Sequence, residues 1–143
     1  MRLINSWYHA VSASHKWGGK PEDYLPIEEF IDSSKKTFGD FRHRAMYHHT
    51  LGVYLCEDLF GKTISLEKAV GRSKEYGDIT KTVQIPVRLI AERHIVEDLG
   101  FLPSPEHYLK NIPFDSDETR WMSGAIRKEV GNFNQIFNKE SNV

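Results

Sequence analysis

The sequence predicts a mainly α-helical single domain that carries a short inserted β-hairpin. Two long stretches place apolar residues at helical spacing, and two short β-prone segments lie between them. Glycine and proline stand at the ends of most of these segments, where helices and strands stop. With 143 residues and 39% hydrophobic residues, the chain is long enough for one core. We expect residues 1–130 to form the domain and residues 131–143 to form a C-terminal tail.

The first two predicted helices are separated by a clear stop signal. Residues 5–17 have the composition of a short aromatic helix, and the run Gly18-Gly19-Lys20-Pro21 ends it. Pro26 suits the first turn of the next helix, which we expect to continue to about Ser34.

The central helix is predicted over residues 41–60, with Asp40 as its N-cap and Gly61 as its end. His49 falls near the middle of the apolar stripe of this helix. At about 100° per residue, the other members of the stripe are Phe41, Ala45, Gly52, Cys56 and Leu59.

The hairpin is predicted from residues 62–66 and 81–87, and residues 67–78 are expected to form a surface excursion with a helical turn. A helix over residues 87–99 follows and stops at Gly100. Its apolar face carries His94 and Asp98. The residues expected in the core of the two helices are Ala45, Gly52, Cys56, Leu59, Ile90 and Ala91.

The remaining chain has weaker signals. Ser104 and Pro105 have the order of an N-cap and a first helical residue, so a short helix should begin there. A last helix is expected over residues 118–130, before the tail.

Composition excludes several classes of function. Lys and Arg number 19 against 20 Asp and Glu, so the net charge of −1 gives no general attraction to nucleic acid or anionic membrane. The single Cys56 excludes an internal disulfide and should behave as a small core hydrophobe. No apolar run approaches the ~18 residues needed to span a bilayer. We therefore expect a cytoplasmic protein.

Histidines supply the best functional indication. Seven occur, and His49 and His94 both fall on apolar helix faces. A buried imidazole needs a hydrogen-bond partner or a metal ion, because its burial is otherwise costly. His94 and Asp98 are four apart and so are neighbours on a helix, with Glu97 as an alternative partner.

One hypothesis is therefore a helical metal-dependent hydrolase acting on a phosphorylated or nucleotide-like substrate. The predicted ligands of a zinc, iron or manganese ion are His9, His49, His94 and Asp98. Glu97 or Glu57 would act as general base on a metal-bound water. The residues expected to hold an anionic substrate are Arg42, Arg44 and Arg88.

The alternative hypothesis is a non-catalytic accessory or interaction protein. The chain has no phosphate-binding loop, no nucleophile elbow, no Cys-x-x-Cys pair and no His-Glu-x-x-His helix. In this interpretation the histidines and acids form a structural polar network. The hairpin excursion and the tail would then dock a protein partner or a second copy of the chain.

An ordered set of short motifs also indicates a family. These motifs are Trp17-Gly18-Gly19, Phe41-Arg42-His43-Arg44-Ala45, His48-His49, Pro86-Val87-Arg88 and His94-x-x-Glu97-Asp98-Leu99-Gly100. The set resembles an uncharacterised family of small proteins encoded by bacteria and their phages, a domain of unknown function. The resemblance covers about residues 8–113, and residues 66–79 are longer than it leads us to expect. It implies no activity.

Overall fold

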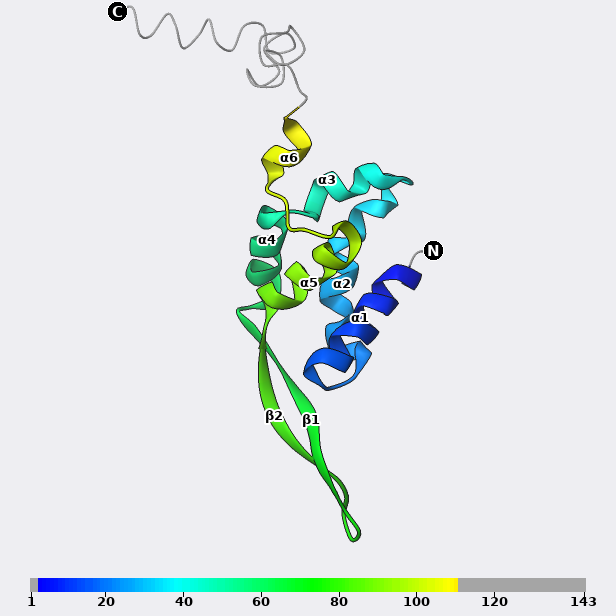
Figure 1. Cartoon of the computed structure of the whole chain (residues 1–143), viewed down its shortest axis with the longest axis vertical. Coiled ribbons are helices and arrows are strands. Elements are labelled where there is room, and N and C mark those ends of the chain that lie inside the picture. Colours follow the sequence, from blue (N-terminus) through cyan, green and yellow to red (C-terminus); the bar gives the residue numbers. More distant parts are fainter. Residues whose placement is uncertain (1–2, 111–143) are drawn as a thin grey trace, which may run out of the picture. The chain divides into compact units, whose positions relative to one another are not determined.

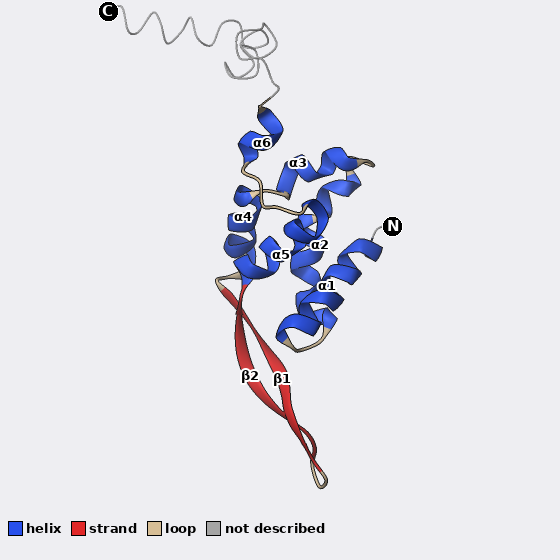
Figure 2. Cartoon of the chain, in the orientation of Figure 1, coloured by secondary structure: helices blue, strands red, loops and turns tan. Residues whose placement is uncertain are grey.

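The computed structural model of the chain describes residues 3–110, and it confirms a mainly helical fold with one antiparallel hairpin (Figures 1 and 2). The residues up to Pro105 form one compact unit. The predicted helix at residues 118–130 and the tail at residues 131–143 lie outside the described residues. In chain order the elements are α1 (Leu3–Trp17), α2 (Pro21–Ile31), η1 (Ser33–Lys36), η2 (Phe41–His43), α3 (Arg44–Tyr47), α4 (Thr50–Phe60), β1 (Thr63–Ser73), β2 (Gly77–Pro86), α5 (Val87–Leu99) and α6 (Pro105–Leu109).

Helix α2 lies at the centre of the compact unit, where it packs against α1, α4 and α5 (Figure 1). Apolar residues at helical spacing on each of these four helices face this centre and bury one another. The fully buried hydrophobic residues of the four helices are Ala10, Ala13, Tyr24, Ile27, Ile31, Val53, Cys56, Val87, Ile90, Ala91 and Ile95. None of the helices among residues 3–110 has the length and apolar character needed to cross a membrane.

The turn between α1 and α2 orients the two helices. Gly18 and Gly19 adopt positive φ angles of 93° and 74°, which side chains with a Cβ rarely accept. The Tyr24 hydroxyl donates to the Gly18 carbonyl at 2.7 Å, and the Lys20 amide donates to Asp23 Oδ2 at 2.7 Å. The sequence led us to expect the start of this helix near Pro26, but α2 begins at Pro21. Pro26 lies inside the helix on its exposed side.

The single central helix predicted over residues 41–60 is wrong. The chain forms η2, then α3, and breaks at His48 and His49 before α4 begins. The His49 backbone is extended, with φ −161° and ψ 175°, and its ring nitrogen Nδ1 accepts from the Gly52 amide at 3.1 Å. The Thr50 amide donates to the Pro103 carbonyl at 2.9 Å, so a distant loop holds the break in place.

The break changes which residues are buried. Cys56, Gly52, Ile90 and Ala91 are buried as predicted, and burial raises the pKa of the Cys56 thiol to about 12. The predicted core positions Ala45 and Leu59 are wrong, because both are exposed. Phe41, at the other end of the predicted stripe, is exposed as well. The prediction assumed one continuous helix, in which residues at helical spacing share a face. Residues before and after the break no longer share a face, because the chain changes direction between them.

The hairpin is longer than predicted. The expected excursion over residues 67–78 is strand except for the turn at residues 74–76, and β1 and β2 pair along their whole length with an irregularity between Ala69 and Gly71. Leu66 and Ile85 bury the base of the hairpin, whereas most residues farther out are exposed on both faces. The exposure of both faces explains why the sequence did not predict these strands. A strand with two solvated faces lacks the apolar alternation that marks a half-buried strand.

Gly52 should be essential to the break between α3 and α4. A Cβ built at this position would overlap the carbonyl oxygen of Tyr47, whereas one built at Gly39 meets nothing within 4 Å. We expect Gly52→Ala to lower the free energy of unfolding by about 1–3 kcal/mol through overpacking. Gly39→Ala, the matched control, should change it by less than about 0.5 kcal/mol. Equal values for the two variants in urea denaturation would contradict the packing described.

Candidate metal centre

A cluster of buried imidazole and carboxylate groups lies between the central helices. Helices α1, α2 and α5 contribute to it, and so does the break before α4. Its members are His9, Glu28, Asp32, His48, His94 and Asp98. All six come from the unit that ends at Pro105, so one folded body positions them.

His94 lies at the centre of the cluster and is fully buried. Its Nδ1 lies 2.6 Å from Glu28 Oε2. Its Nε2 lies 3.3 Å from Asp32 Oδ1 and 3.4 Å from Asp98 Oδ2. Because both ring nitrogens face carboxylate oxygens, a metal-free His94 needs a proton on each nitrogen.

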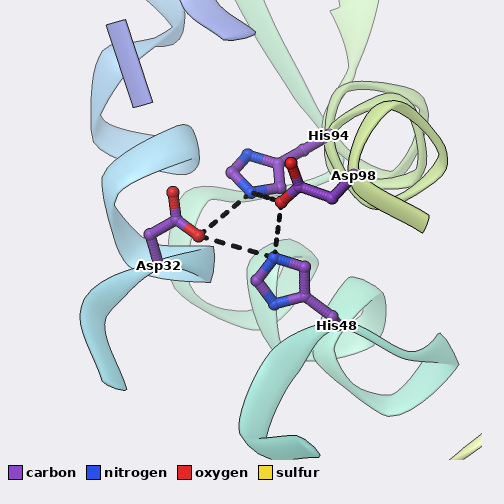
Figure 3. A group of neighbouring side chains, drawn as sticks. All are labelled: Asp32, His48, His94 and Asp98. Carbon is purple, nitrogen blue, oxygen red and sulfur yellow. Dashed lines mark hydrogen bonds and ion pairs between the residues drawn. The ribbon is translucent and has the colours of Figure 1, made fainter. Parts of the chain in front are cut away.

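His48 faces the same two aspartates from the opposite side. Its Nε2 lies 2.9 Å from Asp98 Oδ2 and 3.4 Å from Asp32 Oδ1. Carboxylates and imidazoles therefore alternate around a closed ring, which Figure 3 shows with its four labelled side chains. Each of the four offers one ligand atom, and these atoms all lie within 4.8 Å of one another.

The spacing of these atoms fits a shared transition-metal ion. Atoms about 2.1 Å from one ion lie about 3.0 Å apart at right angles and about 3.4 Å apart at the tetrahedral angle. The four distances around the ring run from 2.9 to 3.4 Å. Two imidazole nitrogens with two carboxylate oxygens are donors that zinc, iron and manganese accept.

Further groups hold the outer oxygens of the two aspartates. His9 Nε2 lies 3.1 Å from Asp98 Oδ1, and the His9 ring lies against the His94 ring with 3.9 Å between centroids and an angle of 31° between the ring planes. On the other side, the Ser6 hydroxyl donates to Asp32 Oδ2 at 3.2 Å, and Lys35 Nζ lies 3.3 Å from the same oxygen. The inner oxygens are thereby left to face His48 and His94.

Electrostatics of the metal-free cluster favour charged groups. Burial alone would raise the pKa values of Asp32 and Asp98, but hydrogen bonds with His48 and His94 outweigh it and hold both below the ordinary range. Burial would lower the pKa of His94, but hydrogen bonds with Asp32, Asp98 and Glu28 raise it well above the ordinary value. Glu28 differs from the two aspartates, because its burial raises its pKa above the ordinary value. The negative charge beside His94 therefore lies mainly on Asp32 and Asp98, and a divalent cation would offset it.

The predicted ligands divide into two groups. The structure brings His9 of α1 together with His94 and Asp98 of α5, although the two helices are far apart in the sequence. His49 does not join them, since its Nδ1 accepts from the Gly52 amide and its Nε2 lies 3.1 Å from the Ala45 carbonyl oxygen. The prediction placed His49 from its angular position on a continuous helix. That placement is wrong because His49 caps α4 and does not lie within a helix.

The predicted general bases lie in different places. Glu97 is 3.7 Å from His9 Nδ1, at the partly exposed edge of the cluster. Glu57 is buried elsewhere, where Lys62 Nζ approaches its Oε2 to 2.6 Å and Arg88 lies 3.9 Å from its Oε1. Only Glu97 is therefore near the cluster through a described contact.

The predicted anion-binding arginines have local partners and do not form one patch through their described contacts. Arg42 is exposed and pairs with Asp40 at 2.9 Å. Arg44 lies over the Phe41 ring at 4.8 Å. Arg88 lies 3.4 Å from Glu92 on its own helix.

Sequence reasoning missed Glu28, Asp32 and His48 as members of the cluster. Glu28 and Asp32 are four apart and both are buried, Glu28 on the α2 face that carries Ile27 and Ile31 and Asp32 at the C-cap of the helix. Acids on an apolar face are a usable signal, but it depends on the correct start of α2. His48 gave no such signal, because its position depends on the break before α4.

Comparison with known proteins places the chain in a family without assigning an activity. A family model described as "Domain of unknown function (DUF6915)" matches residues 4–122, and the chain belongs to this family. Searches of curated proteins and of solved structures found no match. The chemistry of the cluster therefore has to be inferred from its own geometry.

Because His94 is buried among three carboxyl groups, the stability of the metal-free protein should depend on pH. Its folded pKa is raised, so its contribution is complete below the unfolded value of about 6.5 and is lost as pH rises toward the folded value. In that window the free energy of unfolding should fall by about 1.4 kcal/mol per pH unit for this one proton. Urea denaturation in chelator between pH 6 and 9 measures the slope.

His94→Gln should remove this slope. The aspartates and the buried His43 and His49 act at lower pH, because their folded pKa values are lowered and their contributions are lost as pH falls. Identical slopes for the wild type and His94→Gln above pH 6.5 would show that His94 is not held as an imidazolium.

Proposed function

We propose that this chain is a metal-binding protein that holds one divalent transition-metal ion between Asp32, His48, His94 and Asp98. The observation that carries the proposal is the closed ring of alternating carboxylate and imidazole atoms, with neighbours 2.9 to 3.4 Å apart. Random burial of charged groups would rarely produce four ligand atoms converging on one point, since such burial is costly.

The groups behind the ring support the same proposal. A metal-bound histidine usually donates its other ring N–H to a carboxylate, which fixes its tautomer and orientation. Glu28 provides that carboxylate for His94 Nδ1 at 2.6 Å. His9 has the equivalent role for Asp98, because it holds Oδ1 and leaves Oδ2 for the ion.

The donor types define the class of ion. Imidazole nitrogen with carboxylate oxygen suits zinc, iron and manganese, whereas calcium and magnesium prefer oxygen ligands alone. The two aspartates of the ring carry a charge of −2 between them, which a divalent ion balances. A divalent ion therefore fits the site in charge as well as in size.

Metal content tests the proposal directly. Protein purified without a histidine tag should bind about one equivalent of zinc, manganese or ferrous ion and gain thermal stability on loading. His48→Gln should lose most of this binding, because its amide is a poorer ligand than imidazole. His15→Gln changes an exposed histidine outside the cluster and should retain full metal content. Mass spectrometry of the metals and calorimetric titration provide the measurements.

A structural polar network is the alternative that the contacts also allow. The His94 imidazolium touches three carboxylates and could close the cluster with protons alone. A wild-type protein that binds no metal, while His48→Gln still loses stability, would support this alternative. Under it, docking of a partner or a second copy by the long hairpin stays a prediction.

Hydrolysis of a phosphorylated substrate is the reaction that we propose for the loaded site. Asp98 is the most exposed of the four ligands, with 17% of its side chain accessible, so solvent reaches the ion from that side. Glu97 lies next to Asp98 in the chain, and a divalent ion lowers the pKa of a bound water toward neutrality. Arg93, 3.5 Å from Glu97, is better placed for an anionic substrate than Arg42, Arg44 or Arg88.

Replacement of Glu97 tests the catalytic part of this proposal. Glu97→Gln should lower kcat for a phosphate ester by about 10²–10⁴-fold if Glu97 is the general base, and it should leave metal content intact. Glu92→Gln is the matched control, since Glu92 also pairs with an arginine four residues away on α5. Absence of any metal-stimulated hydrolysis of phosphomonoesters, diesters or nucleotides would remove the reaction from the proposal and leave metal binding standing.

A further inference from the structure

His43 is a buried histidine beside the four-residue ring that the site described above does not use. Its side chain is only 8% exposed, and its Nε2 lies 3.7 Å from Asp32 Oδ1. That nitrogen has no hydrogen-bond partner among the described residues. An unsatisfied buried ring nitrogen facing a carboxylate calls for a physical explanation.

The hydrogen bond of His43 Nδ1 determines which ring nitrogen carries the proton. His43 Nδ1 lies 2.8 Å from the Asp40 carbonyl oxygen, which can only accept, so Nδ1 carries the proton and donates. In the neutral ring Nε2 then has a lone pair and no hydrogen. A lone pair and a carboxylate oxygen face each other across 3.7 Å, an arrangement that a cation between them would stabilise.

The backbone around His43 is anchored well enough to present a ligand. Asp40 caps η2 by accepting from the Arg42 amide at 3.0 Å, and the Ser34 hydroxyl donates to the His43 carbonyl at 2.8 Å. The ring of His43 lies 5.2 Å from the ring of His48, edge to face. His43 therefore approaches the site from the η1 and η2 side, beside Asp32 and His48.

We propose that His43 Nε2 is a fifth ligand of the ion held by Asp32, His48, His94 and Asp98, an inference that rests on the metal-binding function proposed above. Two equatorial ligands of a five-coordinate ion at about 2.1 Å lie about 3.6 Å apart, close to the distance between His43 Nε2 and Asp32 Oδ1. His43 is not among the four residues whose atoms all lie within 4.8 Å of one another, so its ring has to move toward the ion for Nε2 to bind it.

A fifth ligand narrows the class of ion. Three imidazoles and two carboxylates suit an ion that accepts five or six ligands, such as ferrous or manganous ion. A structural zinc site is by contrast almost always closed with four ligands. The site would then retain at most one position for water.

His43→Asn is the most informative substitution. Its amide nitrogen stands near the position of Nδ1 and can still donate to the Asp40 carbonyl, whereas the group at Nε2 is lost. Cobaltous ion is the probe, because its visible absorption strengthens as coordination falls from five or six ligands to four. We expect His43→Asn to bind cobalt at least tenfold more weakly and with stronger visible bands, while His15→Gln matches the wild type in both.

The wild-type protein supplies a second measurement that does not depend on the folding of a variant. In the proton spectrum of the cobalt-loaded protein, each ligand histidine contributes one strongly shifted exchangeable N–H signal. Three such signals are expected, from His43, His48 and His94, and two would overturn the inference. Unchanged affinity and absorption in His43→Asn would also overturn it while leaving the four-ligand site intact. A wild type that takes up no cobalt, manganese or iron would instead refute metal binding itself.

Discussion

The contact between His94 and the acids around it determines how the central helices assemble. His94 is fully buried on α5, where Glu28 of α2 and Asp32 at the C-cap of α2 contact it. Two helices that would otherwise pack through aliphatic side chains are thereby held in one register, because a displaced partner would leave a buried charge uncompensated. The apolar residues around the cluster exclude water and strengthen each of these contacts.

The break between α3 and α4 serves the same cluster. A continuous helix through this region would fix His48 and His49 about 100° apart on one cylinder. The observed extended backbone at His49 instead lets His48 face Asp32 and Asp98, while His49 turns back to cap α4. Gly52 allows the Tyr47 carbonyl to approach closely at this point. The two adjacent histidines thus have different roles, since His48 contacts the aspartates of the cluster and His49 caps α4.

The cluster has an inner and an outer side. His48, His94 and Asp32 are almost fully buried, and Asp98 is more exposed, with 17% of its side chain accessible. His9 and Glu97 lie at this outer side, and His43 lies at the inner end near η2. The hairpin does not join the cluster. Its Leu66 and Lys68 pack against the turn between α1 and α2. Its distal part contributes nothing to the cluster through any described contact.

Local patterns in the sequence were enough to predict the helical class, the inserted hairpin, the bounds of the helix that carries His94, and the proximity of Asp98 to His94. These features depend on residues within a few turns of one another, where spacing and end signals act directly. Tertiary contacts decided the rest. The Thr50 amide meets the Pro103 carbonyl, so the break that places His48 depends on a loop some fifty residues away. Glu28 and Asp32 joined the cluster because α2 packs on α5, and no local pattern contains that contact.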